Sequence, residues 1–309
     1  MRFLVETLDS ILNQSYTNLE IIIVDDGSTD MTSQYLDTLV DQDSRVRVIS
    51  MKENLGESAA INLAWISVKS RYVAIINSDD PPVLNWAELM MRAASCNEGY
   101  GFYYPNRMVI DQTGSFLRYE NLHEWSLKTL YRKMIPIASA GMVIDRMGFP
   151  NDFVLRDETL KHPSDLFQVL RMAKHSSGFR VSEAVGVWRE HDKNISRSGF
   201  EFANSFEKNL SVWIDKNLKL ISKYSSPGLS YSYLYLQYIN LLLDTLPARQ
   251  SLLTLFKRSN FLSKVRRYPS MIFWLSSVIL RKYCWRALPQ YLRYLKLLVS
   301  SNNNKGIIK

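Results

Sequence analysis

The feature that most constrains the fold is an apolar run that ends in two acids, within the stretch NLEIIIVDDGSTD. Four consecutive apolar residues, 21–24, lead directly into Asp25 and Asp26 and then into a glycine and small polar residues. The run is rich in β-branched side chains and too short for a helix of its own, so it predicts a strand buried on both faces, as in parallel sheets. The question is why such a strand should end in two carboxylates.

The same arrangement recurs further along the chain, where residues 71–80, RYVAIINSDD, predict a strand that ends in Asn77, Asp79 and Asp80. Helical and strand patterns alternate around these two runs with short links between them. The expected helices cover residues 3–14, 32–42, 56–70 and 85–96, and further strands cover 45–50 and 101–110. This alternation predicts an α/β fold with a doubly wound, mostly parallel sheet flanked by helices.

The pattern of apolar residues changes near residue 205. From there apolar and aromatic residues recur at helical spacing, and prolines divide the segment into several helices. We therefore expect two domains, an α/β domain over residues 1–204 and a helical region over residues 205–309. The two cysteines, Cys96 and Cys284, lie far apart without metal-ligand spacing, which favours a reducing compartment such as the cytoplasm.

The net charge of +8 is unevenly distributed between these regions. Residues 251–309 hold 12 of the 38 Lys and Arg and none of the 30 Asp and Glu, so residues 1–250 carry 26 basic and 30 acidic side chains. The longest apolar run in the basic segment, residues 271–280, is ten residues long, whereas a spanning helix needs about 20. The pattern predicts an in-plane amphipathic helix on an anionic membrane surface, although helices packed on the protein with a solvated basic face would also explain it. Nucleic acid is not expected as a partner.

The acids at the two strand ends suggest a shared site. In open α/β sheets, ligands bind outside the carboxyl ends of the strands. If the two strands are neighbours, Asp25, Asp26, Asp79 and Asp80 converge on one crevice, and their mutual repulsion favours a bound cation. Oxygen ligands of this kind suit magnesium or manganese. The same residue types also form turns and helix caps after strands, so the argument depends on there being two such loops.

Four segments in this order resemble glycosyltransferase family 2, whose members have the nucleotide-sugar-binding GT-A fold. They are IIIVDDGSTD, ENLGESAAINLA, YVAIINSDD and WREHDKNIS, and the resemblance covers residues 2–198. It implies that Asp25, Asp26, Asn62 and Asp79 bind the nucleotide of the donor. Two positions depart from the family pattern: Ile61 and Ala64 stand where arginine and glycine are frequent.

The resemblance also implies a divalent metal, magnesium or manganese, bound by Asp79, Asn77 and Asp80. Asn77 stands where the family usually has an aspartate. Arg189 and His191, within WREHDKNIS, match an element that contacts the diphosphate.

The segment HPSDLFQVLRM resembles the stretch that supplies the catalytic base of the family. Asp165 takes the base position, with Ser164 where a glutamate is usual. Two acids just upstream, Asp157 and Glu158, are alternative bases. A carboxylate in this position would deprotonate the acceptor hydroxyl as it attacks the anomeric carbon.

These observations predict an inverting glycosyltransferase of the hexosyl-transferring type. It would use a nucleotide-diphosphate donor, of the uridine type by resemblance, and a polysaccharide or lipid-linked oligosaccharide acceptor. Its expected location is the cytoplasm, peripheral at the inner face of the cell membrane. The alternative is a catalytically impaired remnant or a non-catalytic binding module with the same fold. The expected helix at residue 3 is a crossover without a preceding strand, and the family's opening strand is the one missing, so we expect a start site assigned too late, a fragment or a decayed gene.

Overall fold

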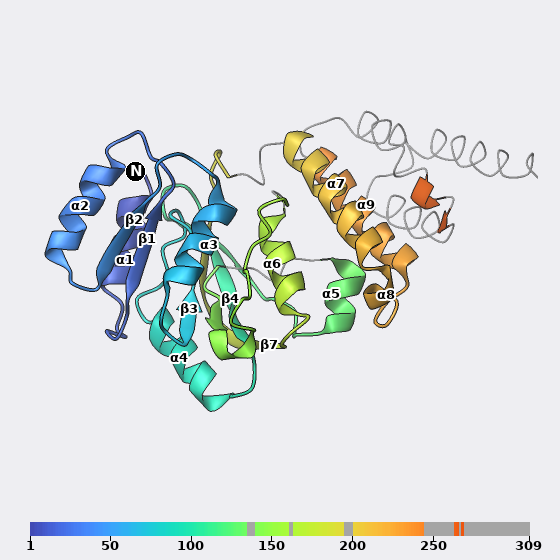
Figure 1. The fold of residues 1–309 in the computed structure, drawn as a ribbon, viewed down its shortest axis with the longest axis horizontal. Coiled ribbons are helices and arrows are strands. Elements are labelled where there is room, and N and C mark those ends of the chain that lie inside the picture. The colour runs from blue at the N-terminus through green and yellow to red at the C-terminus, as the bar shows by residue number, and fades with distance from the viewer. Residues whose placement is uncertain (135–139, 161–162, 195–199, 244–262, 266, 269–309) are drawn as a thin grey trace, which may run out of the picture. The chain divides into compact units, whose positions relative to one another are not determined.

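The computed structural model describes residues 1–134, 140–160, 163–194, 200–243, 263–265 and 267–268 (Figure 1). The chain divides into two compact units: Met1–Leu130 with Ile135–Arg197, and Tyr131–Met134 with Ser198–Lys309. The helices are α1 Leu4–Leu12, α2 Thr32–Gln42, α3 Glu57–Ser67, α4 Trp86–Cys96, α5 Leu127–Lys133, α6 Ser164–Met172, α7 Phe200–Lys216, α8 Leu218–Ile221 and α9 Pro227–Leu243, with a 3₁₀ turn η1 at Arg146–Gly148. The strands are β1 Ile21–Asp25, β2 Val46–Ser50, β3 Tyr72–Ala74, β4 Phe102–Ile110, β5 Phe116–Glu120, β6 Val143–Asp145 and β7 Gly178–Arg189.

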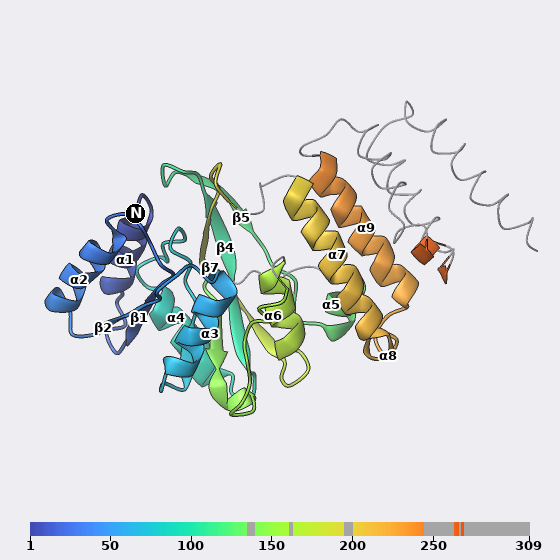
Figure 2. The ribbon, with the colours of Figure 1, turned by 45° about the horizontal axis from the view of Figure 1, so that its top comes forward.

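The first unit contains a small parallel sheet at its N-terminal end. Strands β1 and β2 pair in parallel, with Ile21 opposite Val46 and Asp25 opposite Ser50, and helices α1 and α2 accompany them (Figures 1 and 2). Leu8 of α1 and Leu36 of α2 pack with the strand residues in one hydrophobic cluster. The apolar run before the two acids is a strand, and Ile21 and Ile23 on one of its faces pack against α1 and α2.

The larger sheet of the first unit has the order β3-β6-β4-β5, and β7 pairs with β4. Strand β6 is antiparallel to both β3 and β4, whereas β4 and β7 are parallel. Strands β3, β4 and β7 consequently run in the same direction, and their carboxyl ends lie on the same side of the sheet. The segments that follow these ends are residues 75–80, the turn after Ile110 and the stretch after Arg189.

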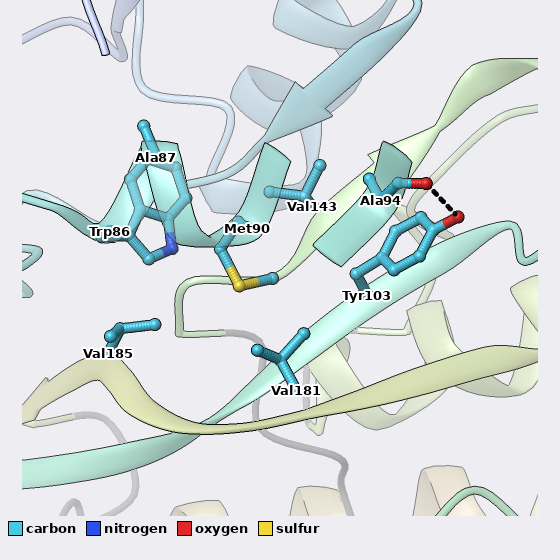
Figure 3. Packing of buried hydrophobic residues seen from close by; sticks show 8 residues of the cluster. All are labelled: Trp86, Ala87, Met90, Ala94, Tyr103, Val143, Val181 and Val185. Carbon is cyan, nitrogen blue, oxygen red and sulfur yellow. Dashed lines mark hydrogen bonds between the residues drawn. The ribbon is translucent and has the colours of Figure 1, made fainter. Parts of the chain in front are cut away.

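Helix α4 covers this larger sheet through a closely packed apolar cluster (Figure 3). Met90 and Ala94 of α4 are fully buried, as is Tyr103 of β4. The Tyr103 hydroxyl donates hydrogen bonds to the carbonyls of Ala94 (3.4 Å) and Asn97 (2.7 Å), so its polar atom is satisfied at the end of the helix. This packing holds β4 in place. Strand β7 pairs with β4 directly and β3 is joined to it through β6, so β4 determines the positions of the two strands that lead to the site.

The second unit is helical over its described residues. Helices α7 and α9 lie side by side (Figures 1 and 2), and tyrosines of α9 donate to acceptors on α7. Tyr231 donates to Asp215 (2.6 Å) and Tyr235 to Glu207 (3.1 Å). Helix α7 is continuous from Phe200, and the unit takes in Ser198–Lys309 together with Tyr131–Met134. The domain boundary at residue 205 stays a prediction.

The predicted α/β class with a GT-A-like arrangement is confirmed, and the expected helices and strands of residues 1–110 are present. Two details differ. Strand β3 covers only Tyr72–Ala74, since β6 offers it just three partners. The expected single sheet is two sheets within the described residues, because β1 pairs with β2, β3 pairs with β6, and no hydrogen-bonded strand joins them.

Most of the basic segment 251–309, including the apolar run 271–280, lies outside the described residues. Across the part of the chain that the structure describes, no helix has the length and apolar character required to cross a membrane.

Candidate functional site

The candidate site centres on a pair formed by Asp79 and His191 at the carboxyl ends of β3 and β7. His191 Nε2 lies 2.9 Å from Asp79 Oδ2. The other ring nitrogen, Nδ1, accepts the backbone N–H of Lys193 at 3.1 Å. A neutral imidazole that accepts at Nδ1 carries its proton on Nε2, so His191 donates to the carboxylate. Asp79 remains 27% exposed and keeps its second oxygen available.

Asp80 lies beside this pair but points into the protein. Its Oδ1 accepts the backbone N–H of Arg189 (2.9 Å), and its Oδ2 accepts the amide of Asn77 (2.9 Å). Burial, reinforced by the Asp79 charge, raises the pKa of Asp80 to about 7 despite these two hydrogen bonds. Asp80 therefore ties the loop after β3 to the end of β7, whereas Asp79 faces the open side.

Arg189 anchors the same cluster with a fully buried guanidinium. Its Nε donates to the backbone carbonyl of Asp79 (2.9 Å) and its Nη1 to that of Asp111 (3.4 Å), which ends the neighbouring strand β4. Nη2 forms an ion pair with Glu6 of α1 at 2.7 Å. The predicted phosphate-contacting residues Arg189 and His191 are thus brought together with Asp79, with Arg189 as the inner member.

The start of α1 covers this cluster, an arrangement that no sequence pattern predicted. The ring of Phe3 stacks on His191, with centroids 4.7 Å apart, and the Arg189 guanidinium lies 4.8 Å from the Phe3 centroid. Glu6 supplies the counter-charge described above. Phe3 and Glu6 are ordinary residues of an amphipathic helix in the sequence, and only the tertiary fold places them against a segment that is remote in the chain.

The first acidic loop uses its carboxylates mainly to build itself. Asp25 is 5% exposed and accepts the N–H of Ser28 (3.0 Å) and the hydroxyl of Ser33 (2.9 Å). Burial alone would raise the pKa of Asp25, but these hydrogen bonds outweigh it and hold the pKa below the ordinary value. Asp26 accepts the N–H groups of Leu55 (2.8 Å) and Gly56 (2.9 Å), which fastens the loop to the start of α3.

The first residues of the chain connect the two acidic loops. The amino group of Met1 lies 3.2 Å from Asp30 of the first loop, and Phe3 stacks on His191 beside the second. Two residues of extended chain span at most about 7 Å. The first three residues of the chain therefore contact both the loop after β1 and the Asp79–His191 pair.

The remaining predicted site residues lie apart from this cluster. The amide of Asn62 on α3 bonds Arg156 and Glu158 and is buried, so nucleotide binding stays a prediction for it. Asp165 is the second residue of α6, half-buried, and bonds only the N–H of Leu166 (2.8 Å) among the described residues. The alternative base Asp157 caps the turn at Thr159.

No group of three or more His, Cys, Asp or Glu side chains that could hold a metal is present among the described residues. A surface cleft of about 870 Å³ lies between α2 and β2. It is lined by Leu19, Glu20, Asp37, Val40, Asp41, Ser44, Arg45, Val46, Arg47, Val48 and Ser50. None of the predicted site residues lines it, so the cleft is separate from the strand-end cluster.

Comparison with known proteins identifies the family. Residues 2–153 match the family model of "Glycosyl transferase family 2". Residues 2–153 of the chain belong to glycosyltransferase family 2. The protein is accordingly a glycosyltransferase, and the fold fits this assignment. The structure of S. aureus TarS 1–349 in complex with UDP matches 100% of this chain and 89% of that chain. The TM-score is 0.58 and the sequence identity is 15%.

Two curated relatives show how far the similarity extends. "Glycosyltransferase GlyG" of Streptococcus pneumoniae serotype 4 is 26% identical over 265 residues, which is 79% of this chain and 83% of that protein. "Putative teichuronic acid biosynthesis glycosyltransferase TuaG" of Bacillus subtilis is 41% identical over 78 residues, 25% of this chain and 31% of that protein. The closer identity is therefore confined to a short part of the chain, and the donor and acceptor of this family member have to be argued from its own site.

Proposed function

We propose that this family 2 glycosyltransferase transfers a sugar, with inversion, from a nucleotide-diphosphate donor bound between the loops of Asp25–Asp26 and Asp79. The observation that carries the proposal is the cluster of Asp79, His191 and Arg189 at the carboxyl ends of β3 and β7. The side chains bring a carboxylate, an imidazole and a guanidinium to the edge where open α/β sheets bind ligands. The UDP and UDP-GlcNAc complexes of TarS support a nucleotide sugar as the donor.

The oxygen atoms left over in this cluster fit a divalent cation. Asp79 keeps one carboxylate oxygen and Asn77 its amide oxygen without a hydrogen bond among the described residues, and both side chains reach solvent. Asp80 does not fit as a third ligand, because hydrogen bonds hold both of its oxygens. Magnesium and manganese complete their shells with water and substrate phosphates, so two protein ligands suffice. Such an ion would offset the charge that builds on the leaving diphosphate.

The residues of the chain have distinct parts in this scheme. His191 donates its Nε2 proton to Asp79 and thereby fixes the direction of the free carboxylate oxygen. Arg189, whose charge is paired with Glu6, holds the backbone of the Asp79 loop in place. Asp165 would accept the proton of the acceptor hydroxyl as that oxygen attacks the anomeric carbon, a contribution of about 10²–10⁴-fold. Holding donor and acceptor in line provides a further part of the rate.

For the acceptor we propose a growing surface polysaccharide or a lipid-linked oligosaccharide at an anionic membrane. The support is the basic segment 251–309, with 12 Lys and Arg and no Asp or Glu, since each basic residue near an anionic leaflet contributes about 1 kcal/mol. Co-sedimentation with phosphatidylglycerol vesicles should be salt-sensitive and absent with phosphatidylcholine vesicles. Equal binding to both would argue against this location.

The catalytic proposal is tested by measuring release of nucleoside diphosphate and sugar transfer with a panel of nucleotide sugars. Asp165→Asn should lower turnover by about 10²–10⁴-fold, whereas Asp157→Asn should leave it within a few fold. The reverse pattern would assign the base to Asp157. A wild-type chain that binds donors but neither hydrolyses nor transfers the sugar would support the non-catalytic binding module instead.

A further inference from the structure

Arg156 is a buried guanidinium that the described residues do not satisfy. Its side chain is 2% exposed, and neither Nε nor Nη1 has a hydrogen-bond partner. The nearest carboxylate oxygen in an ion pair, Glu57 Oε1, lies 3.6 Å from Nη2, and the Glu57 side chain is 43% exposed. A buried cation without full pairing is costly to a fold. Its presence therefore indicates a partner that the described residues do not supply.

The backbone of Arg156 is held on both sides by one side chain. The Asn62 amide donates to the Arg156 carbonyl (3.0 Å), and its Oδ1 accepts the Arg156 N–H (2.9 Å). Asn62 is itself buried on α3 and also donates to Glu158 (2.8 Å). This two-point attachment fixes the backbone from which the buried Arg156 side chain extends, which lowers the ordering cost of binding.

The first turn of α3 lies next to that guanidinium and has no side-chain cap. Its N-cap is Gly56, with φ of 94°, and Glu57, which faces Arg156, is the first helical residue. A Cβ built at Gly56 would meet nothing within 4 Å, so the space over the helix start is open. The N-terminus of an 11-residue helix carries a partial positive charge and unpaired N–H groups, which favours an anion in that space.

We propose that Arg156 and the first turn of α3 form an oxyanion site that receives a phosphoryl group, with Asn62 as its positioning residue. The inference deepens the proposed function and rests on it for the source of the phosphoryl group, a nucleotide-sugar donor. Asp26 binds the N–H groups immediately before this turn, so the site adjoins the first acidic loop. The guanidinium fork suits phosphate oxygens, to which it can donate in pairs.

The test is titration of pyrophosphate, without metal or nucleotide, into the full chain followed by calorimetry and thermal melting. Wild type should bind pyrophosphate and gain melting temperature by mass action. Arg156→Met should weaken binding by about ten- to a hundredfold, the loss expected for charge-assisted hydrogen bonds, and its melting temperature should not respond to pyrophosphate. Without pyrophosphate this variant should melt no lower than wild type, because the buried charge that it loses is only partly compensated by the long ion pair to Glu57.

Arg92→Met is the matched control. Arg92 is 64% exposed and lies 3.8 Å from Glu183, so the substitution removes the same charge from the surface. It should bind pyrophosphate as wild type does. Should Arg156→Met fail to fold, Glu57→Gln provides a second arm: removing the competing carboxylate should tighten pyrophosphate binding severalfold. Unchanged pyrophosphate affinity in Arg156→Met, or in Glu57→Gln if that arm is needed, would overturn the proposal.

A second titration with nucleotide sugars separates this proposal from the proposed function. If Arg156→Met weakens nucleotide-sugar binding along with pyrophosphate binding, the phosphoryl group is that of the donor. If the wild-type chain binds no nucleotide sugar while Arg156-dependent pyrophosphate binding persists, the oxyanion site is supported and a nucleotide sugar as the donor is contradicted. Undiminished nucleotide-sugar binding in Arg156→Met would overturn the link to the donor and leave the proposed function intact.

Discussion

The two acidic loops of this enzyme, residues 25–30 after β1 and 77–80 after β3, look alike in sequence but differ in what their carboxylates do. Asp25 and Asp26 accept hydrogen bonds from the chain itself, four in all, and shape the loop. In the second loop the two acids have different roles. Asp80 is buried and holds the loop to the end of β7, whereas Asp79 keeps an exposed oxygen. An acid after a strand is therefore available to a ligand only if its carboxylate oxygens do not already accept hydrogen bonds from the protein.

The electrostatics of the loops differ in the same way. Hydrogen bonds lower the pKa of Asp25, and burial raises that of Asp80 to about 7. The first loop is thus most stable with its carboxylate ionised, whereas the second tolerates a proton on Asp80. Substitutions in the first loop should change mainly stability, and substitution of Asp79 should change mainly activity.

The largest expected effect is that of Asp79→Asn on catalysis. Losing the carboxylate that faces the diphosphate should lower kcat/KM by about 10²–10³-fold, as for removal of one electrostatic stabiliser. The melting temperature should fall little, since Asp79 is 27% exposed. Transfer kinetics and thermal melts check both parts, with Asp37→Asn on the exposed face of α2 as the control. A decrease in kcat/KM of less than tenfold in Asp79→Asn would contradict the assignment of the second loop, rather than the first, to catalysis.

Asp80 should give the second loop a characteristic pH dependence of stability. Between its ordinary value of 3.8 and about 7, the folded protein holds a proton on Asp80 that the unfolded chain has lost. The free energy of unfolding should therefore fall as pH rises through this window, by up to about 1.4 kcal/mol per pH unit. Urea denaturation at several pH values, with a chelator present to remove metal ions, measures this dependence. In Asp80→Asn the free energy of unfolding should change less with pH than in wild type. A slope that survives the substitution would contradict the assignment.

In the first loop, Asp26→Ala should cost stability. It leaves the N–H groups of Leu55 and Gly56 without their acceptor, which should lower the free energy of unfolding by about 1–3 kcal/mol. Denaturant titration measures the change, and Asp37→Ala is again a control. A variant as stable as wild type but unable to bind nucleotide sugars would show that Asp26 belongs with Asp79 as a ligand-binding residue.

The smallest effect should come from Gly56→Ala, which tests the turn that Asp26 fastens. Gly56 has φ of 94°, a conformation that other residues adopt only with strain, and the space around it is open. The expected cost is about 1 kcal/mol, all of it from the backbone. A stabilised variant in denaturant titration would mean that the turn does not keep this conformation in solution.

The sequence predicted the first 110 residues of the fold well, because periodic apolar patterns with short links determine those helices and strands locally. The expected segment 32–42 is helix α2 to the residue, and strand β4 is close to its expected range. Strand β3 ended early because the pairing partner β6 is short, and the sequence of β3 cannot report that. Strand β7 was not predicted, since Gly178, Glu183 and Gly186 interrupt its apolar pattern.

The site was predictable in its residue types but not in its contacts. Asp79, Arg189 and His191 were expected from the motifs, and the structure brings them together. The pairing of Glu6 with Arg189 and the stacking of Phe3 on His191 depend on tertiary packing, which no local pattern encodes. The role of Asn62 at the nucleotide stays a prediction, and its bonds to the backbone of Arg156 were not foreseen. The buried Arg156 guanidinium, whose Nε and Nη1 have no partner among the described residues, carries no signature in the sequence.

The central claim is that the Asp79 loop, with a divalent cation, binds a nucleotide sugar. The most direct measurement is a thermal-shift screen of nucleotide sugars with and without manganese, on wild type and Asp79→Asn. The account predicts that at least one nucleotide sugar raises the wild-type melting temperature, more with manganese than without it, and that Asp79→Asn loses the manganese-dependent part. A wild-type chain that no nucleotide sugar stabilises, or a full manganese-dependent shift in Asp79→Asn, would contradict it.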